Sequence, residues 1–107
     1  RDMLDHARQV VNLLKDETRA ALEYDIKLFG AVCWSLSIVG EAASKVSAEW
    51  RQANPQVPWR QAIATRNFLV HAYSDIDYDV LWETATVSIP ELLVELEKLL
   101  PPETQDQ

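Results

Sequence analysis

The stretch YDIKLFGAVCWSLSIVGEAASKVSAEW, residues 24–50, decides the fold because it carries a long stripe of apolar residues at helical spacing. Members of the stripe recur every three or four residues, which places them on one face of an α-helix. At 1.5 Å per residue this helix is about 40 Å long, longer than most domain helices. Gly30 and Gly40 are small, so a second helix can approach closely there. The stripe comprises Leu28, Phe29, Val32, Leu36, Val39, Ala43, Val46 and Trp50.

The segments on either side predict further helices joined by short connections. Apolar residues spaced by three and four over residues 2–15 predict a first helix, and the polar stretch KDETRAA that follows is a turn or a weak helical start. Pro55 and Pro58 forbid continuation of the long helix. Pro58 suits the first turn of a third helix, which is predicted to run to about Tyr73.

A fourth helix is predicted after the loop SDIDYD, where Ser74, Asp75 or Asp77 can act as its N-cap. Pro90 should kink this helix or divide it in two. Four helices with short connections imply an all-α protein, an antiparallel up-and-down bundle of four to five helices. Residues 1–107 are expected to form a single domain, with about 101–107 as a frayed tail.

Composition and charge restrict the function. No apolar run approaches the roughly 20 residues of a membrane span, so no membrane contact is expected. The one cysteine, Cys33, lies in the apolar run AVCWSL, which favours a buried, inert thiol in a reducing cytoplasm. The net charge of −7 argues against broad, salt-driven binding to nucleic acid. It still allows a small RNA-cutting site, and it suits a basic protein partner.

An arginine interrupts the apolar face of the predicted third helix in the stretch RNFLVHAY, residues 66–73. On a regular helix Arg66 shares a face with Trp59, Ile63 and Tyr73. A guanidinium in an apolar stripe is costly unless it is paired or lies at an opening, so Arg66 is expected at an interface or in a cleft. His71 lies about 140° around the helix from Arg66, so the two converge only if the helix ends or two copies meet.

Several segments together resemble the HepT branch of the HEPN superfamily, the toxin half of bacterial HepT–MNT toxin–antitoxin pairs. The matching pieces are IVGEAASKVS (38–47), NPQVPWRQAIATRNFLVHAYSDID (54–77) and, more loosely, VLWETATVSIPELL (80–93). The opening RDMLDHARQVV also looks like the first helix of that family. The order of these pieces, with PW shortly before the motif R-N-x-x-x-H-x-Y, is more specific than the motif alone.

The resemblance implies a HEPN-like helical bundle that forms a homodimer and cleaves RNA at the dimer cleft without a metal ion. By position, Arg66 and His71 correspond to the catalytic pair, and Asn67 to a polar residue that positions the RNA. Tyr73 corresponds to the tyrosine that an MNT-type nucleotidyltransferase antitoxin modifies with AMP (AMPylation), which silences the toxin. The implied partners are therefore a second copy, the antitoxin and RNA.

The chemistry of these residue types suits RNA cleavage. RNA carries its own nucleophile, the 2′-hydroxyl, and an imidazole can take or give a proton near neutral pH. A permanently charged arginine can stabilise the negative charge that builds at phosphorus. Glu41, among small residues of the long helix, either contacts the Arg66 region in a supporting role or is an ordinary surface glutamate.

Other interpretations of the same residues remain open. Arg66 and His71 can instead form a buried ion-pair network that only orders an interface. At the level of function, the alternative is a non-catalytic HEPN-fold dimer that binds a nucleotidyltransferase. The four tryptophans are interpreted as core or dimer-interface anchors rather than as platforms for base stacking: Trp34, Trp50, Trp59 and Trp82.

A metal site has little support in the sequence. Asp75, Asp77 and Asp79 have the alternating spacing that opens a calcium-binding loop, but Val80 and Thr86 replace the required glycine and glutamate. A helix-capping acidic loop is therefore favoured. The two histidines and the cysteine have none of the spacings of a zinc site, so neither metal nor cofactor is expected.

Overall fold

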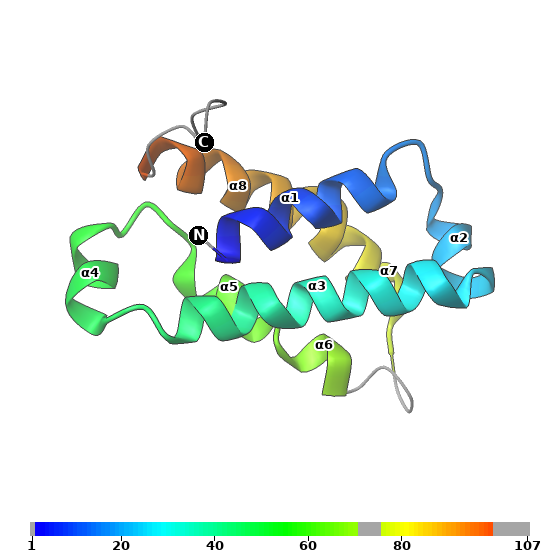
Figure 1. Cartoon of the computed structure of the whole chain (residues 1–107), viewed down its shortest axis with the longest axis horizontal. Coiled ribbons are helices and arrows are strands. Elements are labelled where there is room, and N and C mark those ends of the chain that lie inside the picture. Colours follow the sequence, from blue (N-terminus) through cyan, green and yellow to red (C-terminus); the bar gives the residue numbers. More distant parts are fainter. Residues whose placement is uncertain (1, 71–75, 100–107) are drawn as a thin grey trace, which may run out of the picture.

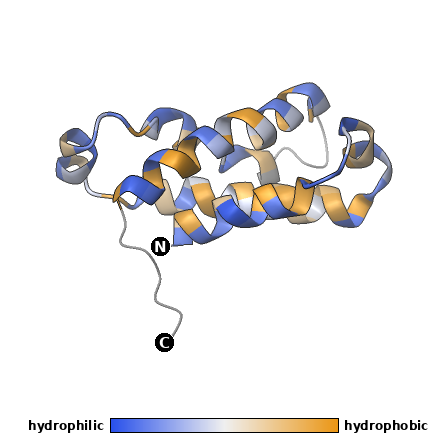
Figure 2. Ribbon diagram, turned by 90° about the horizontal axis from the view of Figure 1, so that it is seen from above, coloured by the Kyte–Doolittle hydropathy of each residue, from blue (hydrophilic) through white to orange (hydrophobic). Residues whose placement is uncertain are grey.

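The long helices of the protein are amphipathic and enclose a common apolar interior (Figure 2). The computed structural model describes residues 2–70 and 76–99 (Figure 1). No β-strand occurs in these two ranges, so the predicted all-α class is confirmed. Their elements are α1 (Asp2–Leu14), α2 (Arg19–Tyr24), α3 (Ile26–Ser44), α4 (Ala48–Ala53), α5 (Trp59–Ala64), α6 (Asn67–Val70), α7 (Tyr78–Glu83), the π-helix η1 (Thr84–Ser88) and α8 (Ile89–Leu99).

These elements form an antiparallel bundle with up-and-down connections, as the sequence predicts (Figure 1). The helix α3 runs back along α1, α5 and α6 return beside α3, and the run from α7 through η1 to α8 runs back beside α1. The helix α3 is central because it contacts α1, α2, α5 and α6. The core is built from its apolar residues and from those of α1 and α8, including Leu4, Val10, Val32, Leu36, Val39, Leu92 and Leu96.

The long helix predicted over residues 24–50 is wrong at both ends. Asp25 interrupts it, because its carboxylate accepts hydrogen bonds from the backbone N–H groups of Lys27 and Leu28, at 3.1 Å each, and starts α3 as an N-cap. After Ser44 the chain leaves the helix, and Ser47 caps the separate α4 by accepting a bond from the N–H of Trp50. Short polar side chains at both points compete with continuous helix.

The fourth predicted helix is present as the run from α7 through η1 to α8. Of the proposed caps, Asp77 fills this position, since its carboxylate accepts bonds from the N–H groups of Asp79 and Val80. The predicted division near Pro90 takes the form of the π-helix, in which the N–H of Ile89 bonds to the carbonyl of Thr84. Pro90 has no N–H to offer to the preceding turn, so the α-helical ladder cannot run unbroken through this region.

Burial confirms the interpretation of Cys33 as an inert thiol. The side chain is fully buried in the core, and this burial raises the pKa of the thiol to about 11. The thiol therefore stays protonated at neutral pH, which makes it a poor nucleophile.

The helix α3 is apolar enough to require a comparison with membrane spans. Ile26–Ser44 has the length and hydropathy of a span, contrary to the expectation that no run approaches one. Half of this window is buried inside the bundle, as in the core helix of a globular protein.

Candidate functional site

The chain turns at Arg66 instead of continuing as a helix. The predicted helix from Pro58 to Tyr73 is wrong here: α5 ends at Ala64, and α6 starts at Asn67. Tighter bonds between residues three apart replace the α-helical ladder, with the N–H of Arg66 donating to the carbonyl of Ile63 at 3.3 Å. The regular 100° rotation that related Arg66 to its neighbours therefore does not apply across this turn.

A close approach to α3 explains where the turn lies. A Cβ atom at Gly40 would lie 2.3 Å from the backbone N of Arg66 and 2.8 Å from its Cα. No real Cβ contact is that short, so the absence of a side chain at Gly40 lets the backbone of Arg66 rest directly on α3. The expected close approach is thus present at Gly40, whereas a Cβ at Gly30 would have nothing within 4 Å.

A buried hydroxyl fixes the same turn. Thr65 is buried, and its Oγ1 lies 2.8 Å from the carbonyl oxygen of Leu36 and 2.7 Å from that of Ala62. The hydroxyl proton can reach either acceptor, so Thr65 joins the end of α5 to the middle of α3. Gly40 lies one turn beyond Leu36, so both contacts hold the turn against one face of α3.

The Arg66 side chain is half exposed rather than buried in an apolar stripe. Its exposed fraction is 48%, and its Nη1 lies 3.8 Å from Oε1 of Glu41, whose side chain is 54% exposed. The structure therefore brings Glu41 and Arg66 together, as one of the two interpretations of Glu41 expected. A half-exposed pair at this distance is loose and contributes little to stability.

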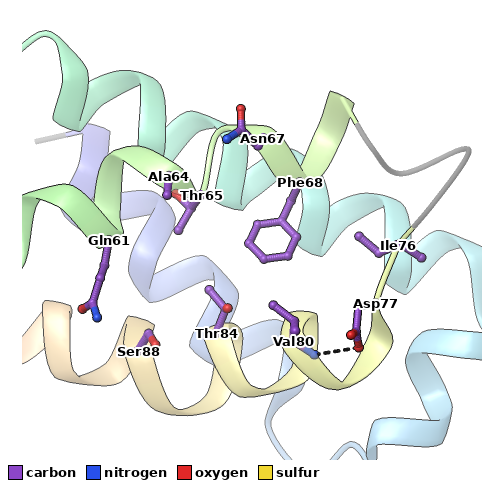
Figure 3. Close-up of a pocket in the computed structure, with 10 residues that line it drawn as sticks. All are labelled: Gln61, Ala64, Thr65, Asn67, Phe68, Ile76, Asp77, Val80, Thr84 and Ser88. Atoms are coloured by element: carbon purple, nitrogen blue, oxygen red, sulfur yellow. Dashed lines mark hydrogen bonds between the residues drawn. The ribbon is translucent and has the colours of Figure 1, made fainter.

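Asn67 follows Arg66 at the start of α6, at the rim of a pocket of about 450 Å³ (Figure 3). The pocket lies between α5 and α6 on one side and α7 and η1 on the other. Phe68 points into it, toward Val80. The Asn67 amide points away from Phe68, so it is free to act outside the pocket.

His71, Tyr73 and the possible cap residues Ser74 and Asp75 lie outside the described residues. The distance from Arg66 to His71 is thus not part of this geometry. In the two described ranges, no group of three His, Cys, Asp or Glu side chains could hold a metal ion. Asp77 caps α7 with its carboxylate, as the favoured interpretation of the acidic loop expects.

Comparison with known proteins agrees with this architecture. A family profile described as "HepT-like: Ribonuclease HepT-like" matches residues 3–99. The chain belongs to the HepT-like ribonuclease family. It is 33% identical to "Probable ribonuclease HepT" of Thermococcus cleftensis, over 92% of this chain and 94% of that protein. No solved structure is a significant match.

The similarity to two further relatives covers almost the whole length of each. The chain is 32% identical to "Putative RNase TTE0752" of Caldanaerobacter subterraneus, over 96% of both proteins. It is also 32% identical to "Putative RNase MJ1380" of Methanocaldococcus jannaschii, over 90% of this chain and 88% of that one. The HepT-like match covers the whole bundle, so Gly40, Thr65 and Arg66 all lie within it.

The sequence pointed to Arg66, Asn67 and Glu41 as candidates, but Thr65, which fixes the turn before Arg66, was not among them. A threonine directly before the arginine is a usable signal, since a Thr hydroxyl near a helix end often bonds to backbone carbonyls. Without the neighbouring helix in place, however, its bond to Leu36 could not be foreseen.

Replacement of Gly40 by alanine should destabilise the protein, because the new methyl group would collide with the backbone of Arg66. We expect a loss of about 1–3 kcal/mol in the free energy of unfolding, measured by urea denaturation. Gly30→Ala is the matched control in the same helix: its methyl group enters open space, so it should stabilise by about 0.5–1 kcal/mol. Equal effects of the two substitutions would contradict the close approach.

Proposed function

We propose that this protein is a metal-independent endoribonuclease toxin of a toxin–antitoxin pair, active in the cytoplasm as a homodimer. In this proposal Arg66 and His71 form the active site at the dimer cleft, and AMPylation of Tyr73 by a nucleotidyltransferase antitoxin silences it. The observation that carries the proposal is the half-exposed Arg66, fixed on α3, in a HepT-like chain that places His71 five residues later.

The reaction needs only groups that the RNA and these two residues supply. The His71 imidazole takes the proton of the 2′-hydroxyl while that oxygen attacks the adjacent phosphorus. The bond from phosphorus to the 5′-oxygen breaks, and this oxygen takes up the proton that the His71 imidazolium returns, so that His71 is again neutral. The products are a 2′,3′-cyclic phosphate and a 5′-hydroxyl. Arg66 stabilises the charge on the phosphorus oxygens in the transition state.

The loose pair between Arg66 and Glu41 suits this role. The pair holds the guanidinium near α3 in the absence of RNA, and a half-exposed pair at 3.8 Å costs little to break. A phosphate oxygen can therefore replace the carboxylate. Glu41 is in this view a supporting residue that keeps Arg66 oriented. Asn67, the residue after Arg66 and the first of α6, is proposed to position the RNA.

A partly exposed stripe on α3 supports the homodimer. Trp34, Ile38 and Glu41 lie at helical spacing on one face, and the stripe ends at Arg66. Trp34 is 53% exposed although it belongs to the central helix of the bundle. Tryptophan is enriched at the centres of protein interfaces. A second copy packed on this stripe would bring its own Arg66 and His71 toward the first pair.

The non-catalytic alternative keeps the same dimer and the same antitoxin partner. The net charge of −7 favours it, because an acidic surface opposes RNA. The two functions differ in one respect, since only the toxin needs Arg66 and His71 for chemistry.

Trp34→Ala should weaken the homodimer, because it removes the largest exposed apolar side chain of the α3 stripe. In sedimentation velocity at micromolar concentration, the unmodified protein should be a dimer and the variant largely a 12.2 kDa monomer. Val94→Ala, which removes a similarly exposed apolar residue from α8, should remain a dimer. A monomeric unmodified protein would refute the dimer cleft.

His71→Ala and Arg66→Ala should each abolish cleavage of RNA in vitro while leaving the helical circular dichroism and the dimer intact. The physical reason is the loss of the proton acceptor in one variant and of the charge at phosphorus in the other. Cleavage by the unmodified protein should survive EDTA. Cleavage only with added magnesium would exclude the metal-independent mechanism, and undiminished cleavage by both variants would exclude the site.

Tyr73→Phe should retain much of the RNase activity but lose the hydroxyl that accepts AMP. After incubation with antitoxin and ATP, mass spectrometry should show adenylylation of the unmodified chain at Tyr73 and none in this variant. Tyr24→Phe is the control, because Tyr24 is 75% exposed and tests whether exposure alone selects the acceptor. Adenylylation at Tyr24 with Tyr73 untouched would overturn the assignment.

A further inference from the structure

A hollow of about 600 Å³ lies between α4 and α5 and is lined in part by Pro55 of the connection between them. We call it the α4–α5 hollow. The helix α4 lies at one end of the bundle (Figure 1). Arg51 and Gln52 line it from α4, and Trp59, Arg60 and Ile63 line it from α5. Trp59 is buried and its ring N–H donates to the carbonyl of Asn54 at 2.9 Å, so the apolar floor is fixed. No carboxylate is among the lining residues.

In the described residues, the two arginines of this hollow are among the cations that form no ion pair, together with Lys15, Lys27 and Lys45. Arg8, Arg19 and Lys98 pair with carboxylates of Glu97, Asp79 and Glu95. Within residues 2–70 and 76–99, neither Arg51 nor Arg60 forms an ion pair or a side-chain hydrogen bond. The Nε of Arg51 is moreover buried without a hydrogen-bond partner. Buried donors are normally satisfied, so the Nε–H group of Arg51 lacks an acceptor that it would usually have.

The charge of the chain is distributed unevenly around this hollow. Residues 41–66 contain four cationic side chains and two carboxylates, and thus carry +2 in a chain of net charge −7. The cations are Lys45, Arg51, Arg60 and Arg66. The rest of the chain therefore carries −9. An anion near this protein is repelled by most of its surface and attracted to the segment that includes the hollow.

The hollow also lies close to the proposed active site along the chain. Ile63 forms part of its lining, and the carbonyl of Ile63 accepts the bond from the N–H of Arg66. The lining of the hollow is thus directly bonded to the backbone of the residue that we place at the scissile phosphate. A strand of RNA whose reacting phosphate meets Arg66 would carry further phosphates past this region.

We infer that the α4–α5 hollow binds a phosphodiester group of the RNA substrate a short distance from the scissile bond, through the guanidinium groups of Arg51 and Arg60. This inference rests on the proposed function. Arginine offers several donors in a planar arrangement that matches phosphate oxygens, and Trp59 gives the hollow an apolar floor. Arg51 and Arg60 are in this view binding residues, with no part in the bond-breaking step.

An acidic protein surface would meet the same two guanidinium groups. RNA is favoured because Ile63, which lines the hollow, is hydrogen-bonded through its carbonyl to the N–H of Arg66, the residue that the proposed function places at the reacting phosphate. The contact would also explain how a protein of charge −7 holds a polyanion: the attraction is local and confined to one end.

The test compares two double variants of equal charge. Arg51→Gln/Arg60→Gln removes both cations of the hollow, and Lys15→Gln/Lys27→Gln removes two exposed cations from the opposite end of the bundle. We expect the first to raise KM for RNA cleavage about tenfold, with kcat within about twofold, and the second to change neither strongly. Arg51→Lys/Arg60→Lys keeps the charge and should restore part of the loss.

Binding without cleavage gives a second readout. Each double change is added to the His71→Ala protein, and the affinity for a fluorescent single-stranded RNA is measured at several salt concentrations. Loss of two phosphate contacts should reduce the slope of log K against log salt by about 1.4. If the Gln double variant does not fold, Arg60→Gln alone at this exposed residue should reduce the slope by about 0.7.

The outcomes separate this inference from the proposed function. Equal KM and equal salt slopes in the two double variants would overturn the RNA site even if the protein cleaves RNA. Normal RNA binding together with weakened binding of the nucleotidyltransferase would assign the hollow to an acidic protein surface instead, which also overturns it. Failure of the unmodified protein to cleave RNA refutes the proposed function. The measurement of RNA binding still shows whether the α4–α5 hollow contacts RNA.

Discussion

The missing side chain of Gly40 determines how the second half of the bundle meets the first. Because nothing projects from α3 at this point, the backbone of Arg66 lies directly against it, and the chain turns there between α5 and α6. The bond from Thr65 to the carbonyl of Leu36 joins the same two elements within a buried environment. Arg66 is therefore held through its main chain, and its guanidinium stays free to face solvent and Glu41.

This division of roles explains how an exposed arginine can have a defined position. Surface arginines usually sample many rotamers, and a half-exposed pair such as that with Glu41 restricts them only in part. At Arg66 the Cα is fixed by packing, so only the side-chain torsions remain variable. A site placed on a rigid element is more precise than one on a free loop, which suits the proposed stabilisation of charge at phosphorus.

The spacing of the apolar residues was sufficient to predict an all-α fold. The positions where helices start and end depended instead on capping side chains and on contacts between distant residues. The stripe from Leu28 to Val39 and the residues of α1 predicted the core helices, because burial follows the helical repeat. The helix ends at Asp25 and Ser47 were readable in principle as caps, but the long stripe concealed them. The turn at Arg66 could not be read locally, since its cause is Gly40, far away in the sequence.

The candidate site shows the same contrast. Arg66, Asn67 and Glu41 were identified from residue type and family resemblance, and the structure places Glu41 against Arg66. The net charge of −7 argued against broad, salt-driven binding to nucleic acid. The net charge is a sum over the whole chain, in which residues 41–66 carry a positive charge and the rest a negative one. Only the folded arrangement of α4 and α5 brings Arg51 and Arg60 together around one hollow.

The π-helix before Pro90 has a consequence for how this chain can change in evolution. A π segment holds one residue more than an α-helical turn over the same rise, so it behaves as an insertion absorbed within a helix. Deletion of one residue from Thr84–Ser88 would therefore return this turn to α-helical geometry and keep α8 in nearly its present orientation. Leu92 and Leu96 would stay in the core. Deletion of one residue from the regular helix α7 would instead rotate everything that follows by about 100°. A change of chain length before Pro90 thus disturbs the core least when it falls within the π-helix.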